Sequence, residues 1–85
     1  MNNEIIGNRI KELRIENEKT GINVSTILGI DQSYYSKIEK GKHEIKLDTI
    51  YRIAEFYNVS IDYITGRTNK KEINKWYYFH MSQKL

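Results

Sequence analysis

The side chains that most often carry out acid–base, nucleophilic or metal chemistry are scarce in this sequence. His43 and His80 are the only histidines, there is no cysteine, and no two carboxylates stand at a spacing that suggests paired acid and base roles. The glycines form no loop of the kind that cradles a phosphate group. The sequence therefore predicts a protein that is not an enzyme and that needs no metal or cofactor.

Positive charge is the next feature that could serve a function. The net charge of +3 is unevenly distributed along the chain. Residues 1–66 hold nine Lys or Arg against ten Asp or Glu, whereas residues 67–85 hold five against one. Within the first part, the stretch 37–46 is locally basic, with four lysines against two glutamates. A net charge of +3 argues only weakly for a nucleic-acid partner, so the positions of these lysines matter more than their number.

Length and composition limit the class of protein. A chain of 85 residues suffices for one compact domain, and without cysteine that domain depends on packing for its stability. No apolar run approaches the ~20 residues needed to cross a bilayer, and the first residues lack a basic segment followed by an apolar stretch. We expect a soluble cytoplasmic protein with no membrane partner.

Glycine alone breaks the chain into helix-sized pieces, since the sequence contains no proline. The five glycines stand at positions 7, 21, 29, 41 and 66. Ile6, Ile10 and Leu13 recur at helical spacing among charged residues, which predicts an amphipathic helix between positions 7 and 21.

Two short helices are predicted on either side of Gly29. Asn23 can cap the first of them, and Gly29 would end it by taking the left-handed conformation that a helix C-terminus often requires. Asp31 is a good N-cap for the second, which carries Tyr35 and Ile38 on one side and ends before the next glycine.

Two further helices complete the expected domain. Apolar residues at spacings of three and four over 47–57 form the strongest amphipathic pattern in the chain. Ser60 then caps a short helix in which Asp62 lies near the positive end of the helix dipole and which Gly66 ends. Five helices with short connections imply a compact all-α fold.

The last part of the chain, residues 67–85, combines a basic linker with the densest aromatic cluster in the sequence. The aromatic run at 76–79 suits a strand as well as a helix, and we favour a helix. These aromatics either cover the core of the domain, form a dimer contact through Trp76, Tyr77 and Phe79, or bind an effector.

Residues 24–41, VSTILGIDQSYYSKIEKG, are typical of two short helices joined by a tight glycine turn. Together with RIKELR at 9–14, LGIDQSYYSKIEKGK at 28–42 and LDTIYRIAEFYNVSIDYITG at 47–66, this stretch resembles the lambda-repressor-like, or Cro-type, helix-turn-helix proteins. The resemblance covers about residues 5–66 without insertion or deletion. It implies a five-helix helix-turn-helix domain in residues 1–66, followed by a C-terminal extension in residues 67–85.

The resemblance also implies a function. Proteins of this family act as transcriptional repressors or regulators that bind double-stranded DNA, with the third helix in the major groove. Their operators usually have two half-sites, so we expect a homodimer on a palindromic operator. The rival hypothesis is an antitoxin or protein-binding adaptor of the same fold, in which the C-terminal extension binds the partner and DNA binding is secondary.

Candidate DNA contacts follow from the same resemblance. The residues expected to face the bases are Gln32, Ser33, Ser36 and Lys37, and those expected to touch phosphates are Tyr34, Lys40, Lys42 and His43. The amide of Gln32 can donate and accept together at the N6 and N7 atoms of adenine, and Lys37 can reach guanine or a phosphate. The ring of Tyr34 could instead pack at the domain edge, and taken alone these polar side chains would suit any solvated helix face. Tyr35 corresponds to an apolar core position, and Arg14 and Glu39 correspond to a salt bridge between the first and third helices.

Departures from the family pattern bear on the first two helices. Gly21 stands where the family usually has a glutamine that clamps a phosphate, so only the backbone N–H of Gly21 or Ile22 can serve there. Glu18 stands where a glycine commonly ends the first helix. We therefore expect the first helix to run longer and the second to begin later, near Asn23.

Overall fold

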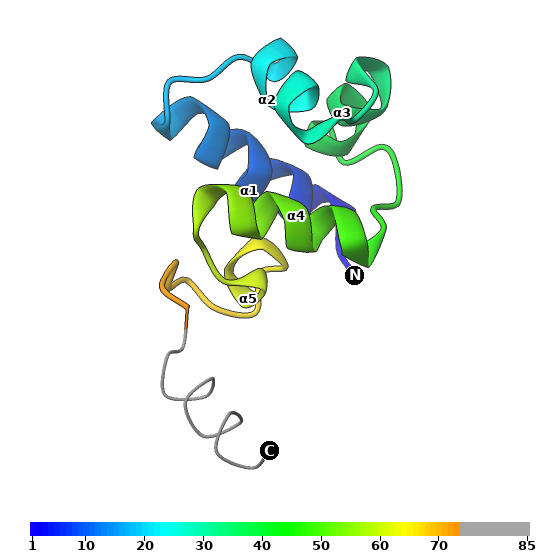
Figure 1. The fold of residues 1–85 in the computed structure, drawn as a ribbon. Coiled ribbons are helices and arrows are strands. Elements are labelled where there is room, and N and C mark those ends of the chain that lie inside the picture. Colours follow the sequence, from blue (N-terminus) through cyan, green and yellow to red (C-terminus); the bar gives the residue numbers. More distant parts are fainter. Residues whose placement is uncertain (74–85) are drawn as a thin grey trace, which may run out of the picture.

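The computed structural model describes residues 1–73 of the chain (Figure 1). Within these residues the chain forms five helices and no strand: α1 (Asn3–Glu16), α2 (Gly21–Leu28), α3 (Gln32–Glu39), α4 (Leu47–Tyr57) and α5 (Ile61–Ile64). The predicted all-α fold with five helices is confirmed. None of the helices in residues 1–73 combines the length and the apolar character needed to cross a bilayer. The helix expected for the aromatic extension lies outside the described residues.

One apolar core joins all five helices. In Figure 1, α2 and α3 lie on one side of α1, and α5 lies on the opposite side, next to α4. Burying the side chain of a valine, leucine or isoleucine contributes roughly 1.5 to 3 kcal/mol, so the aliphatic residues dominate the stability of the domain. The buried apolar side chains are Ile6, Ile10, Leu13, Val24, Leu28, Tyr35, Ile38, Ile45, Ile50, Ile53, Ala54, Val59, Tyr63 and Ile64.

Helix α1 begins before Gly7, because Asn2 caps it. The Oδ1 atom of Asn2 accepts hydrogen bonds from the N–H groups of Glu4 and Ile5, at 3.0 and 3.1 Å. Gly7 therefore lies inside the helix and does not break it. A Cβ atom at Gly7 would stand 2.4 Å from the carbonyl oxygen of Ile38, so glycine allows α1 and α3 to approach closely.

The connection from α1 to α2 differs from the expectation. Helix α1 ends at Glu16, and Glu18 takes the left-handed conformation with φ of 55°, although it is not a glycine. Thr20 caps α2: its Oγ accepts from the N–H of Asn23 at 3.1 Å, while the N–H of Thr20 donates to Asn23 Oδ1 at 3.4 Å. The predictions of a longer first helix and of a second helix starting near Asn23 are wrong, because this reciprocal cap starts α2 at Gly21.

Arg9 fastens α1 to the segment that follows α5. Its Nη1 donates to the carbonyl oxygens of Tyr63 and Thr68, both at 3.0 Å, and its Nη2 donates to Asn69 Oδ1 at 2.8 Å. The guanidinium also stacks over the ring of Tyr63, 4.2 Å from the ring centre. Residues 67–69 are therefore held against the domain.

Candidate nucleic-acid interface

The turn between α2 and α3 forms as the sequence predicts. Gly29 ends α2 with φ of 66°, and the N–H of Ile30 donates to Ser25 O at 2.9 Å. Asp31 caps α3, accepting from the N–H of Tyr34 at 3.1 Å. The caps at both ends of this turn are local, so they set the start and the direction of α3 from the sequence around it.

Helix α3 has one face in the core and one in solvent. Tyr35 and Ile38 are 1% and 0% exposed, which confirms the core position assigned to Tyr35. Gln32, Ser33 and Lys37 are exposed, and Ser36 is half-buried at the edge of the packed face. Three of the four candidate base contacts are thus accessible on α3, whereas Ser36 is only partly exposed.

Tyr34 and His43 brace the loop that follows α3. The half-buried ring of Tyr34 packs against the core, and its hydroxyl lies 3.5 Å from the carbonyl oxygen of Glu44. His43 meets that ring edge to face, with 4.9 Å between ring centres, and its Nδ1 lies 2.8 Å from the same carbonyl oxygen. The ring of Tyr34 therefore packs at the domain edge, which was one of its two expected roles.

Two lysines near this loop remain available for phosphates. Lys40 ends α3 and Lys42 follows Gly41, and both side chains are exposed. The N–H of Lys42 donates to the carbonyl oxygen of Lys37 at 3.0 Å, which ties the loop back to the last turn of α3. The charges of Lys37, Lys40 and Lys42 are thus presented by α3 and by a loop attached to it.

Arg14 and Glu39 join α1 to the end of α3. Arg14 Nε and Nη2 donate to the two carboxylate oxygens of Glu39, at 2.7 and 3.0 Å, and Nη1 donates to Lys19 O at 3.1 Å. The two side chains are 18% and 10% exposed, so water screens this pair poorly. Hydrogen bonding to Glu39 raises the pKa of Arg14 above its usual value. The salt bridge implied by the resemblance is present, and it links α1 to the end of α3.

Two tyrosines surround this ion pair. The hydroxyls of Tyr35 and Tyr57 are buried and have no hydrogen-bond partner within residues 1–73. Burial is the main reason that the pKa of Tyr57 rises to about 12 and that of Tyr35 rises further, and the nearby carboxylate of Glu39 acts in the same direction. Both phenols are neutral at ordinary pH, which leaves Glu39 with one charged partner.

Two residues that bring α1 against α3 and α4 against α2 were missed from the sequence. Gly7 stands between the core positions Ile6 and Ile10 of an amphipathic helix, a pattern that signals close approach of another backbone rather than a helix end. Arg52 of α4 donates through Nη2 to the carbonyl oxygen of Leu28, at the C-terminus of α2. Nothing in the sequence indicates this second contact, because its acceptor is a backbone atom distant in the chain. The candidate dimer contacts Trp76, Tyr77 and Phe79 lie outside the described residues.

Comparison with known proteins identifies the family. The profile of the helix-turn-helix family matches residues 10–64. The cryptic phage CTXphi transcriptional repressor RstR of Vibrio cholerae is 32% identical over 57 residues, which cover 67% of this chain and 51% of that protein. The chain thus spans about half the length of this curated relative.

A solved structure shares the fold. The restriction-modification controller protein C.AhdI from Aeromonas hydrophila superposes with a TM-score of 0.67 and 22% identity, covering 73% of this chain and 94% of that one. The profile match spans the second half of α1 and the whole of α2 to α5. The chain therefore belongs to the helix-turn-helix family, of the lambda-repressor-like, Cro type.

Proposed function

We propose that this protein binds double-stranded DNA in a sequence-specific way and regulates transcription, acting as a repressor. The observation that carries the proposal is the exposure of Gln32 and Ser33 directly after the Asp31 cap. A recognition helix meets base edges with its N-terminal residues, and a major groove about 12 Å wide admits one helix. The matched phage protein is a transcriptional repressor, and the structural neighbour is a controller protein.

The proposal assigns the base contacts to Gln32, Ser33, Ser36 and Lys37. Gln32 is the first choice, because its amide can pair with both the N6 and the N7 atoms of adenine. If it does, Gln32→Ala weakens binding to the operator by roughly 1 to 3 kcal/mol and leaves the affinity for unrelated DNA nearly unchanged. Equal losses on operator and unrelated DNA would remove Gln32 from base recognition.

Phosphate contacts are assigned to Lys40, Lys42 and His43, with Tyr34 at the edge of the same surface. Each such contact releases counterions, so Lys42→Ala reduces the slope of log K against log salt by about one unit on every DNA sequence. A matched control is Arg67→Ala, which removes one exposed positive charge that lies 4.0 Å from Asp62 of α5. In Figure 1, α5 lies on the opposite side of α1 from α3. An equal change of slope in the two variants would mean that the effect comes from total charge and not from this surface.

The operator itself is sought in the DNA that flanks the gene of this protein. A shift assay on that DNA, repeated at two or more salt concentrations, tests DNA binding as a whole. Binding that is weak, insensitive to salt and equal on all fragments would contradict the proposal and favour the antitoxin or adaptor hypothesis. In that case the C-terminal extension becomes the candidate binding segment.

The proposal includes a homodimer on a palindromic operator. Two half-sites about one helical turn apart require two copies of α3 related by a two-fold axis. Residues 1–66 are the proposed DNA-binding unit and residues 67–85 its extension, with Trp76, Tyr77 and Phe79 as the dimer contacts. Sedimentation of the full chain over a range of concentrations tests this part, and a monomer at all concentrations would overturn it.

A further inference from the structure

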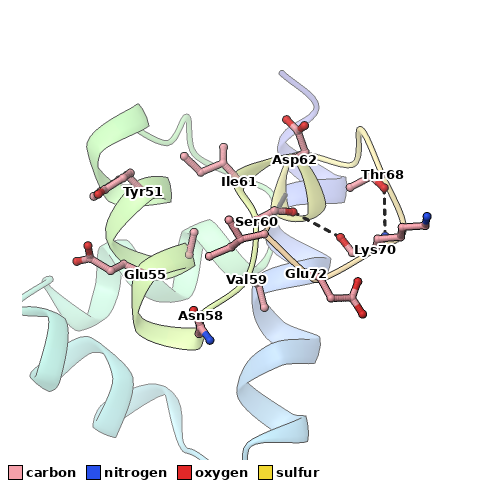
Figure 2. A pocket seen from close by; sticks show the side chains of 12 residues that line it. Tyr51, Glu55, Asn58, Val59, Ser60, Ile61, Asp62, Thr68, Lys70 and Glu72 are labelled. Atoms are coloured by element: carbon pink, nitrogen blue, oxygen red, sulfur yellow. Dashed lines mark hydrogen bonds between the residues drawn. The ribbon is translucent and has the colours of Figure 1, made fainter. Parts of the chain in front are cut away.

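A groove with a volume of about 740 Å³ opens between α4, α5 and residues 68–73. Figure 2 shows Tyr51 and Glu55 of α4 on one side of it, and Lys70 and Glu72 on the other. Its apolar lining comes from Tyr51, Ala54, Val59, Ile61 and Ile73. An apolar floor between polar edges is the form that a binding groove for a hydrophobic segment takes.

The second wall of this groove is held in place by backbone and side-chain contacts. The N–H of Ser60 donates to the carbonyl oxygen of Lys71 at 2.9 Å, and the ammonium of Lys71 pairs with the carboxylate of Glu16 at 2.5 Å. Thr68 is held by Arg9, as described above. Residues 68–73 are therefore part of the folded domain, and the chain continues to residue 74 from Ile73, which itself lines the groove.

The apolar surface of the groove continues along α4. Tyr51 is 50% exposed and Leu47, one helical turn earlier, is 64% exposed. Side chains four apart in a helix are neighbours on its surface, so these two residues extend the lining of the groove. A continuous apolar surface of this kind usually marks an interaction site.

The charge at the groove is opposite to that of the C-terminal segment. Three carboxylates, those of Glu55, Asp62 and Glu72, stand in its lining against the single ammonium of Lys70. Residues 74–85 contain Lys75 and Lys84 and no Asp or Glu. The same segment carries four consecutive aromatic residues, at 76–79, which match the apolar floor.

Geometry favours the groove of a second copy over the groove of the same chain. Consecutive side chains point in different directions in a helix and in a strand alike, so a single groove faces only some of four consecutive aromatic rings. A segment bound to its own domain would leave part of this cluster in water. Exchange between two copies brings two segments and two grooves together, so that rings outside one groove can meet the partner.

We propose that residues 76–79 of one copy bind in this groove of a second copy, and that the second copy returns the same contact. The exchange is self-complementary, as a two-fold dimer requires. This inference rests on the proposed homodimer, and it is independent of the DNA contacts assigned to α3.

The fluorescence of Trp76 tests the inference, because Trp76 is the only tryptophan in the chain. In the full-length protein its emission should lie at short wavelength where the protein sediments as a dimer, and should shift to long wavelength on dilution to the monomer. Emission that stays at short wavelength in the monomer means that the segment binds its own groove, and emission at long wavelength throughout means that it binds no groove. Either result overturns the proposal.

Reversal of one groove charge should weaken the dimer selectively. Glu55→Lys places an ammonium opposite the cationic segment and should raise the dimer dissociation constant roughly tenfold or more. The matched control is Glu44→Lys, the same change at an exposed residue outside this groove, which should leave the constant unchanged. Circular dichroism establishes that both variants remain folded. Equal constants in the two variants contradict the proposal.

Mixing two full-length variants distinguishes exchange from binding within one chain. Trp76→Ala has an intact groove and no tryptophan, whereas Glu55→Lys has the tryptophan and a damaged groove. If segments are exchanged, mixing moves the emission of Trp76 in the Glu55→Lys copies to shorter wavelength, because these segments enter the grooves of the other variant. An unchanged emission overturns the proposal. Shift assays on the same two variants measure DNA binding through the α3 surface, at protein concentrations that saturate unrelated DNA. Failure of this inference and failure of DNA binding are therefore distinguishable.

Discussion

Replacement of Gly7 by alanine tests whether the contact between α1 and α3 sets the position of the recognition helix. An added Cβ would stand 2.4 Å from the carbonyl oxygen of Ile38 and 2.8 Å from that of Glu39, inside the 3.0 Å limit that real Cβ atoms keep. Both obstacles are backbone atoms, so no side chain can rotate away. The two helices must separate by at least about 0.6 Å, the difference between 2.4 and 3.0 Å.

The expected magnitude combines two opposed effects. Forcing an extra methyl group into packed structure costs about 1 to 3 kcal/mol, and alanine in a helix interior is about 1 kcal/mol more favourable than glycine. Because the clash involves two carbonyl groups, we expect the cost near the upper end of that range. The free energy of unfolding of Gly7→Ala should therefore fall by about 1 to 2 kcal/mol.

Gly21→Ala is the matched control, since it makes the same chemical change at a helical glycine. The nearest atoms to a Cβ there are ring carbons of Tyr35, at 3.8 Å, which is an ordinary contact. This variant should be neutral or more stable than the parent by up to about 1 kcal/mol. Urea denaturation followed by circular dichroism measures both variants. If Gly7→Ala is as stable as Gly21→Ala, the close approach of α1 and α3 is not a constraint on the fold.

Three further predictions concern the ion pair, a buried phenol and a strained turn. Glu39→Gln should lower the free energy of unfolding by about 2 to 3 kcal/mol, because Arg14 loses its charged partner. The double variant Arg14→Met, Glu39→Leu should lose less stability than Glu39→Gln alone, because no buried charge is left unpaired. A double variant that is less stable than Glu39→Gln would contradict this account. The folded protein holds the Tyr57 proton more tightly than the unfolded chain, with a pKa near 12 against 10.0, so this part of the stability is present below pH 10 and is lost as the pH rises toward 12. Tyr57→Phe should be as stable as the parent at pH 7, because the hydroxyl has no partner among residues 1–73, and should lose less stability between pH 10 and 12 in the same denaturation assay. Glu18→Gly should raise the free energy of unfolding by roughly 0.5 to 1 kcal/mol, and with it the midpoint of thermal unfolding, since glycine adopts the left-handed conformation without steric cost. A lower midpoint would mean that the chain entropy lost by glycine outweighs the relief of backbone strain.

The elements of this fold that the sequence by itself determined are those with local signals. The periodicity of residues 47–57 predicts α4, and the bounds agree with Leu47–Tyr57. Gly29, Asp31 and Ser60 end or cap their helices as expected, because each acts on backbone groups within a few residues. The Cro-type resemblance, which rests on three such segments in register, was sufficient to place α3 as the candidate recognition helix.

The start of α2 was misjudged although its signal is also local. Thr20 and Asn23 stand three residues apart, and each satisfies a backbone or side-chain group of the other. The sequence pattern predicts Asn23 as the cap itself and a longer α1, because Glu18 is not a glycine. A non-glycine residue can take the left-handed conformation where the structure around it compensates the cost, and that compensation is not visible in one sequence.

Contacts between residues distant in the chain do not follow from local sequence signals. Arg14 and Glu39 are 25 positions apart; the Cro-type resemblance implies their ion pair, and the close packing of α1 against α3 brings the two side chains together. Arg52 reaches a carbonyl oxygen of α2, and the groove assembles from residues between positions 51 and 73. Periodicity and caps specify which face of a helix is apolar and where the helix ends, because they depend on neighbours in the sequence. How closely two helices approach, and which polar atoms meet between them, depends on how the side chains pack in three dimensions.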